Sequence, residues 1–180
     1  MTIPSVHNWL AGDEWNADRL NEVGTAISFL RNPPFVRVGR RLTTQSVPTN
    51  TYTAISFDTV FNSYDPYDMF DAGTPTRVTI KEPGWYSCEG FLSLSATATD
   101  TRALLGIFKN GSNPPTDMLL RFDQGTLPNT GNTNIRKETT LFLNAGDFLS
   151  LFALCDGATL TSQITSDAEH SGMRVRWVSN

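Results

Sequence analysis

The chain has 180 residues, 18% of them charged, and a net charge of −4, so its length suits one domain of ordinary size, or one domain with a short appendage, better than two full domains. The negative charge argues against non-specific binding to nucleic acids, which needs many Lys and Arg side chains. No stretch approaches the ~20 apolar residues that span a bilayer, and residues 1–5 lack the pattern of a signal peptide. We therefore expect synthesis in a cytoplasm, no membrane insertion and no nucleic-acid partner.

The first predicted element is a helix over about residues 16–31. Four of its apolar residues recur at spacings of three and four, the pattern of one helix face: Leu20, Val23, Ile27 and Leu30. Asn16 suits the N-cap, Trp15 suits a hydrophobic staple, and Pro33-Pro34 ends the helix. A helix of four turns is marginal alone. The stripe is therefore expected to pack on its own domain, on sister helices, or on a larger assembly.

After Pro34 the sequence changes to two-residue alternation interrupted by turn residues, which predicts antiparallel strands. The expected strands lie at residues 35–40, 52–57, 77–80, 86–94, 103–109, 118–122, 138–143, 148–155 and 173–178. Within them, Tyr86 and Cys88 share one face with Leu92, while Trp85 and Glu89 share the other. Asn110-Gly111 favours a tight hairpin turn. The predicted fold class is mainly β, a jelly-roll sandwich of about 8–10 antiparallel strands after one short helix.

The residues that carry catalysis in other proteins are scarce. The two histidines, His7 and His170, lie in polar segments, and no nucleophile elbow, zinc-binding helix or phosphate loop occurs. Cys88 and Cys155 lack metal-ligand spacing and are expected to remain thiols in the core. We expect no enzymatic activity, no catalytic or cofactor-binding residues and no cofactor.

Two surface segments admit a functional interpretation beside an ordinary one. The acidic run 65–71 offers carboxylates to calcium, but turn chemistry explains it better, so no metal site is predicted. Tyr64, Tyr67 and Phe70 in the same region form an aromatic loop that either contacts a carbohydrate or protein ligand or packs as a turn. Arg37 and Arg41 are expected on one face of the first strand, a solvated or intersubunit face.

Three motifs, in order and spacing, resemble the complement and tumour-necrosis-factor-like jelly rolls over roughly residues 47–178. They are Arg77-Val78-Thr79-Ile80 followed by Pro83-Gly84-Trp85-Tyr86, then Phe108-Lys109-Asn110-Gly111, then Leu143-Asn144-Ala145-Gly146-Asp147-Phe148. No collagen-like glycine repeat precedes them. The resemblance implies a homotrimer, because these jelly rolls associate about a threefold axis.

The N-terminal part resembles the leader of structural proteins of tailed bacteriophages, as found in phages of actinobacteria. The resemblance rests on Trp9-Leu10-Ala11-Gly12-Asp13, Ala17-Asp18-Arg19-Leu20-Asn21 and Phe29-Leu30-Arg31-Asn32-Pro33-Pro34. It implies a head-fibre, decoration or minor tail protein at the virion surface, bound to phage capsid or tail proteins. The alternative is a tail-associated receptor-binding or carbohydrate-binding module that meets a host surface glycan or protein.

Together the two resemblances divide the chain at the double proline. Residues 1–34 are expected to anchor the protein to the particle, and residues 35–180 to form the jelly-roll domain. The predicted anchoring or trimer-forming residues are Trp9, Trp15, Leu20, Val23, Ile27 and Leu30.

Overall fold

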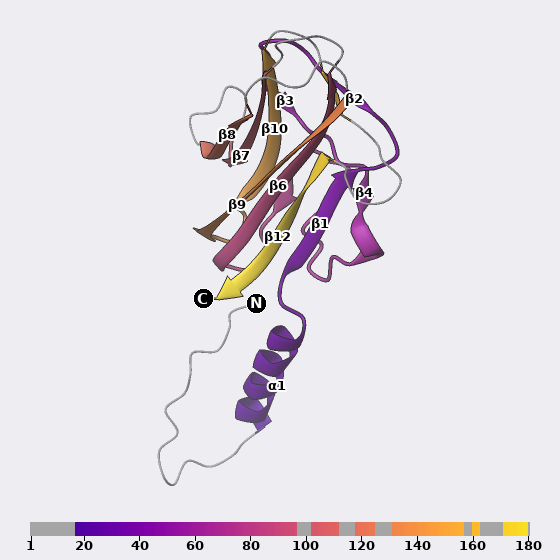
Figure 1. Ribbon diagram of the computed structural model, residues 1–180. Helices are drawn as coiled ribbons and strands as arrows, with labels where there is room; N and C mark the ends of the chain where they lie inside the picture. The colour runs from indigo at the N-terminus through magenta and orange to yellow at the C-terminus, as the bar shows by residue number, and fades with distance from the viewer. Residues whose placement is uncertain are drawn as a thin grey trace.

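The structure, a computed structural model, consists of a β-sandwich with one helix beyond its end (Figure 1). The residues it describes are 17–96, 102–111, 118–124, 131–156, 160–162 and 171–179. Helix α1 covers Ala17–Arg31, which confirms the predicted helix. Asn16, the expected N-cap, lies outside the described residues. The helix ends before the two prolines, because a residue that precedes proline is disfavoured in the helical conformation.

The first sheet has seven strands in the order β2-β11-β6-β12-β1-β4, with β9 paired to β6. Its strands are β1 (Phe35–Arg40), β2 (Gln45–Val47), β4 (Thr59–Val60), β6 (Gly84–Ala96), β9 (Gly131–Leu143), β11 (Leu160–Ser162) and β12 (Ser171–Ser179). A 3-10 turn, η1 (Phe61–Ser63), follows β4. The pairs β1–β12, β12–β6 and β6–β9 are all antiparallel.

The second sheet has five strands in the order β3-β10-β7-β8, with β5 also paired to β10. Its strands are β3 (Thr53–Ala54), β5 (Val78–Thr79), β7 (Arg102–Lys109), β8 (Met118–Gln124) and β10 (Phe148–Asp156). The two antiparallel sheets confirm the predicted jelly-roll sandwich. Sequence patterning missed the short strands β2, β4 and β11. It also predicted longer strands, 52–57 and 77–80, where β3 and β5 have two residues each.

The core lies between the two sheets, and β6 shows how the alternation builds it. Tyr86, Cys88 and Leu92 on the predicted inner face are at most 1% exposed. A Cβ atom at Gly90 would lie 2.8 Å from the Leu151 side chain of the other sheet. Glycine at this position therefore permits close packing of the sheets. Both cysteines are buried free thiols, as predicted, and burial raises the pKa of Cys88 to about 12.

The predicted tight hairpin at Asn110-Gly111 is wrong. Strand β7 ends at Lys109 and β8 begins at Met118, so the connection between them is longer than a two-residue turn. Asn110 does adopt the expected positive φ of 53°. Its side chain, however, binds the loop before β10 instead of closing a hairpin.

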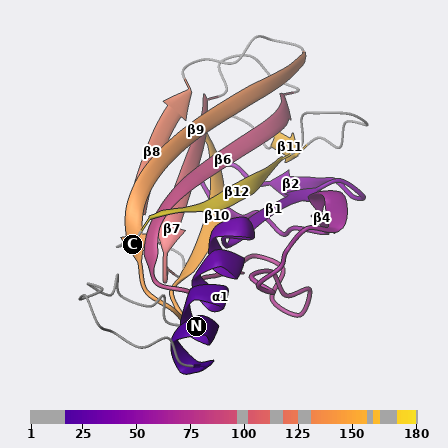
Figure 2. The ribbon, with the colours of Figure 1, turned by 90° about the horizontal axis from the view of Figure 1, so that it is seen from below.

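Helix α1 lies outside the sandwich, at the end where β12 finishes (Figures 1 and 2). Phe29 is its one buried residue. The Phe29 ring packs edge-on against Trp177, with 4.8 Å between ring centroids, and against Tyr67, at 6.1 Å. The Trp177 backbone N–H also donates to Pro34 O at 2.9 Å. The helix is thus fixed to the domain near its C-terminal end.

Candidate assembly and anchoring surfaces

The helix presents its predicted apolar stripe to solvent. Leu20, Ile27 and Leu30 are 55%, 48% and 69% exposed, and Val23 is half-buried. Phe29, which sequence patterning left off the stripe, is the residue that packs on the domain. The stripe therefore stays available for contact with another molecule. The other two predicted anchoring residues, Trp9 and Trp15, lie outside the described residues.

Two of the three aromatic residues predicted to face a ligand point toward the domain. Tyr67 contacts Phe29, and the Phe70 ring lies 6.3 Å from that of Phe57 in the core. Tyr64 is 40% exposed, with its ring 5.9 Å from that of Phe35. Of the predicted loop, Tyr64 is therefore the residue most open to a ligand.

The acidic run in that loop serves as a turn. The Asp65 carboxylate accepts the backbone N–H groups of Met69 at 2.9 Å and Phe70 at 2.8 Å. Asp71 accepts the N–H of Gly73 at 2.8 Å. Within the part of the chain that the structure describes, no group of three or more His, Cys, Asp or Glu residues could hold a metal ion.

In the same part of the chain, no helix is long and apolar enough to cross a membrane.

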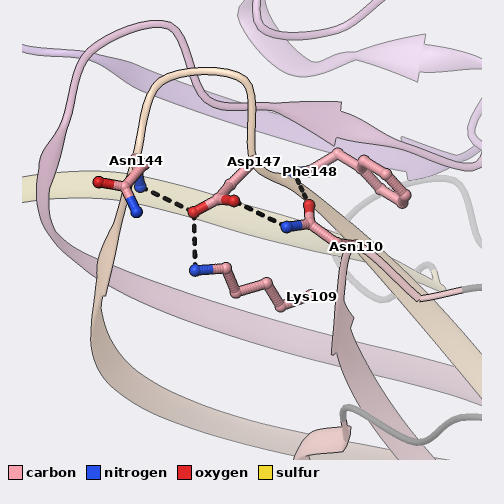
Figure 3. A network of polar contacts seen from close by, with 5 residues as sticks. All are labelled: Lys109, Asn110, Asn144, Asp147 and Phe148. Carbon is pink, nitrogen blue, oxygen red and sulfur yellow. Dashed lines mark hydrogen bonds and ion pairs between the residues drawn. The ribbon is translucent and has the colours of Figure 1, made fainter.

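Two of the three jelly-roll motifs, those at residues 108–111 and 143–148, meet in one polar network (Figure 3). Lys109 Nζ lies 2.7 Å from the Asp147 carboxylate, and Asn110 Nδ2 donates to it at 2.7 Å. The carboxylate also accepts the backbone N–H of Asn144 at 2.8 Å, while Asn110 Oδ1 accepts that of Phe148 at 2.8 Å. Burial alone would raise the pKa of Asp147, but the Lys109 and Asn110 bonds and the Asn144 N–H hold it below its ordinary value. These groups are engaged with one another, so the network joins two loops structurally.

An exposed apolar patch that sequence analysis did not identify lies on the outer face of the seven-stranded sheet. Trp85 on β6 and Phe142 on β9 are directly opposite in the strand register, each 44% exposed, with ring centroids 5.9 Å apart. Val178, 52% exposed, lies beside Trp85 on β12, where the register shifts. We call these three residues the aromatic patch. The signal in the sequence was Trp85 itself, an aromatic residue on the predicted polar face.

The same face carries a band of charged side chains. Glu89, only 4% exposed, is bound by Arg136 from β9 and by Arg174 Nη2 from β12, the latter at 2.8 Å. The Arg37 guanidinium on β1 lies over the rings of Phe61, at 4.7 Å from the centroid, and Phe91, at 5.4 Å. Burial and the positive charges of Arg136 and Arg174 lower the pKa of Arg37.

Arg41 does not share this face with Arg37, contrary to the prediction. Strand β1 ends at Arg40. The Asp58 carboxylate accepts the backbone N–H groups of Arg41 at 2.7 Å, Leu42 at 3.0 Å and Thr43 at 3.1 Å. These three bonds turn the chain out of the strand, so the alternation does not continue to Arg41.

No protein-family model matches the chain, and no curated protein sequence matches it. Solved structures do resemble it. The globular domain of zebrafish complement 1qA protein is 18% identical, covers 82% of this chain and 99% of its own, and superposes with a TM-score of 0.55. The tumour necrosis factor Eiger from S. frugiperda is 15% identical, covers 82% of this chain and 94% of its own, and superposes with a TM-score of 0.57. Murine APRIL is 13% identical, covers 79% of this chain and 95% of its own, and superposes with a TM-score of 0.54. The chain therefore has the jelly-roll fold of complement C1q and tumour necrosis factor domains.

Proposed function

We propose that the protein is a non-enzymatic structural component of a phage virion. It forms a homotrimeric knob, a head decoration or head fibre, that its N-terminal segment anchors to the particle. The resemblance of the N-terminal sequence to leaders of tailed-phage structural proteins supports the virion role. The observation that supports assembly and docking is two exposed apolar surfaces, among the described residues, on a domain with its own buried core. The aromatic patch would join copies of the chain, and the stripe on α1 would dock on the particle.

The aromatic patch supports association because large apolar side chains gain most from leaving water. Full burial of each side chain contributes about 1.5–3 kcal/mol, and exposed aromatic clusters mark interaction sites. In a trimer, each patch meets a different region of the neighbouring copy, which closes a ring. The resemblance to trimeric jelly rolls favours this arrangement over a dimer that uses the patch symmetrically.

Four of the described carboxylates are engaged by the fold, which supports a structural role for them over catalysis. Asp65 and Asp58 accept backbone N–H groups of their own loops, Asp147 closes the loop network, and Glu89 binds two arginines. A general base needs a carboxylate that can reach a substrate proton. These four groups are occupied by the fold itself.

Association is tested by sedimentation velocity of the full chain at micromolar concentration. We expect a species of three times the 19.9 kDa chain. The double substitution Trp85→Ser and Phe142→Ser should reduce it to a monomer that still folds, because both side chains are half exposed in the single chain. Leu42→Ser, which removes a side chain that is 68% exposed on a loop, is the matched control and should leave the trimer intact. A monomeric wild-type chain at these concentrations would refute the assembly.

A further inference from the structure

The charged band places like charges opposite each other on neighbouring strands. Arg37 of β1 pairs in register with Arg174 of β12, Arg174 with Glu89 of β6, and Glu89 with Glu138 of β9. Two positive side chains therefore stand side by side, followed by two negative ones. Like charges directly opposite in a sheet destabilise it.

The carboxylates of the band do not neutralise Arg37. Glu89 is shared between Arg136 and Arg174, and Glu138 accepts the Ser87 hydroxyl. Arg37 makes no ion pair with a carboxylate among the described residues; its guanidinium lies over two phenylalanine rings. Those rings orient the guanidinium without supplying a negative charge. Arg37 and Arg174 thus form a positioned pair of guanidinium groups with an excess of positive charge.

Association through this face would make the excess charge more costly. The outward-facing arginines of β1, β9 and β12 are Arg37, Arg136, Arg174 and Arg176, and the outward-facing carboxylates of β6 and β9 are Glu89 and Glu138. Removing this surplus from water in each of several copies carries a desolvation cost unless counter-charge enters with it. Planar guanidinium groups match the oxygens of phosphate and sulfate in bidentate hydrogen bonds.

We propose that a small oxyanion, inorganic phosphate or sulfate, binds between Arg37 and Arg174 and is enclosed when copies of the chain associate. This inference rests on the proposed assembly, and it names the counter-charge that burial of the arginines would require. The anion supplies the negative charge that the band lacks. An anion that binds the assembled form and not the single chain multiplies the association constant by one plus the ratio of its concentration to its dissociation constant, for each site.

The test measures association of the full chain in chloride, sulfate and phosphate buffers of equal ionic strength. Sedimentation velocity over a range of protein concentrations gives the association constant in each buffer. We expect sulfate and phosphate to raise it about tenfold for each bound anion when the anion is at ten times its dissociation constant. Long-chain polyphosphate should not promote association, because a polymer does not fit inside a closed interface.

Substitutions at the pair separate an anion site from a merely structural role. Arg37→Gln should remove both the repulsion and the anion effect, so that its association in chloride equals that in sulfate. Arg174→Gln should also abolish the anion effect, and it frees Glu89 from one of its two arginines. Arg102→Gln on β7 of the other sheet removes an equal charge at an exposed position. This control should keep the full response to sulfate.

The possible results distinguish the site from the assembly. Equal association of the wild type in all three buffers overturns the anion site while the assembly stands. Repeating the series at higher ionic strength adds a second outcome: association that falls equally in all three buffers also overturns the anion site, since acidic side chains of a neighbouring copy would then supply the counter-charge. No association in any buffer refutes the proposed assembly. In that case, the anion site would still be supported by a sulfate-dependent rise in the melting temperature that Arg37→Gln abolishes, and overturned by the absence of that rise.

Discussion

Single side chains at loop ends fix the parts of the fold that alternation does not specify. Asp147 joins the loop before β10 to the end of β7 through Lys109 and Asn110. The sequence motif indicated that these residues occur in a known jelly-roll pattern. It could not indicate that they contact each other, because the contact spans 37 residues along the chain and replaces the hairpin that Asn110-Gly111 favours.

We expect Asp147→Asn to lower the free energy of unfolding by about 1–3 kcal/mol, because it removes a charge-assisted network while keeping the shape of the side chain. The pKa of Asp147 is lowered by folding, so the carboxylate stabilises the native state above its unfolded pKa of about 3.9. That contribution is lost as pH falls through the lower, folded pKa. The difference between wild type and variant should therefore be constant above about pH 5 and shrink below pH 4.

Urea unfolding at fixed protein concentration measures the effect of Asp147→Asn at each pH. Asp156→Asn, at an exposed position at the end of β10, is the control and should change stability little. A variant as stable as the wild type at pH 7 would show that the network contributes nothing to stability.

At the scale of elements, helix α1 carries an exposed apolar stripe and, apart from it, one apolar residue that packs on the domain. Periodicity correctly grouped Leu20, Val23, Ile27 and Leu30 on one face, but it could not identify Phe29 as the docking residue. The docking depends on Trp177 and Tyr67, which come from distant parts of the chain and meet only in the folded domain. Short isolated helices are marginally stable, so Phe29 contributes to keeping α1 folded.

Phe29→Ala should release α1 from the sandwich, whereas Leu20→Asp with Ile27→Asp should not. Hydrogen–deuterium exchange of α1 peptides is expected to accelerate strongly in the first variant, because the freed helix unravels. In the second variant, exchange should change little, since both side chains project into solvent in the single chain. The double variant should instead weaken attachment to particles. Equal acceleration in both variants would show that the stripe packs on its own domain.

At the scale of the whole molecule, the chain combines a domain with a closed core and a helix with an open face. The fold class was predictable because strand alternation and turn motifs are local features of the sequence. The aromatic patch and the charged band were not, because Trp85 meets Phe142, and Arg37 meets Arg174, only through strand register. Register depends on long-range pairing of β6 with β9 and of β1 with β12.

This division predicts that removal of residues 1–32 separates assembly from attachment. The buried core cluster contains no residue of α1, so the truncated chain should fold and associate as the full chain does. The loss of Phe29 uncovers Trp177, which is expected to lower the free energy of unfolding by about 3 kcal/mol at most. The aromatic patch lies entirely within the retained strands and stays available to neighbouring copies. The truncated knob should nevertheless be absent from purified particles.

Incorporation is measured by complementing phage that lack the protein with either form and labelling purified particles with an antibody to the knob. Label on heads with the full chain, and none with the truncated chain, is the expected result. Label at the tail would favour the receptor-binding alternative, in which exposed Tyr64 is the first residue to test against host glycans. Incorporation of the truncated knob at normal levels would refute anchoring by residues 1–34, because the stripe on α1 would then have no role in attachment.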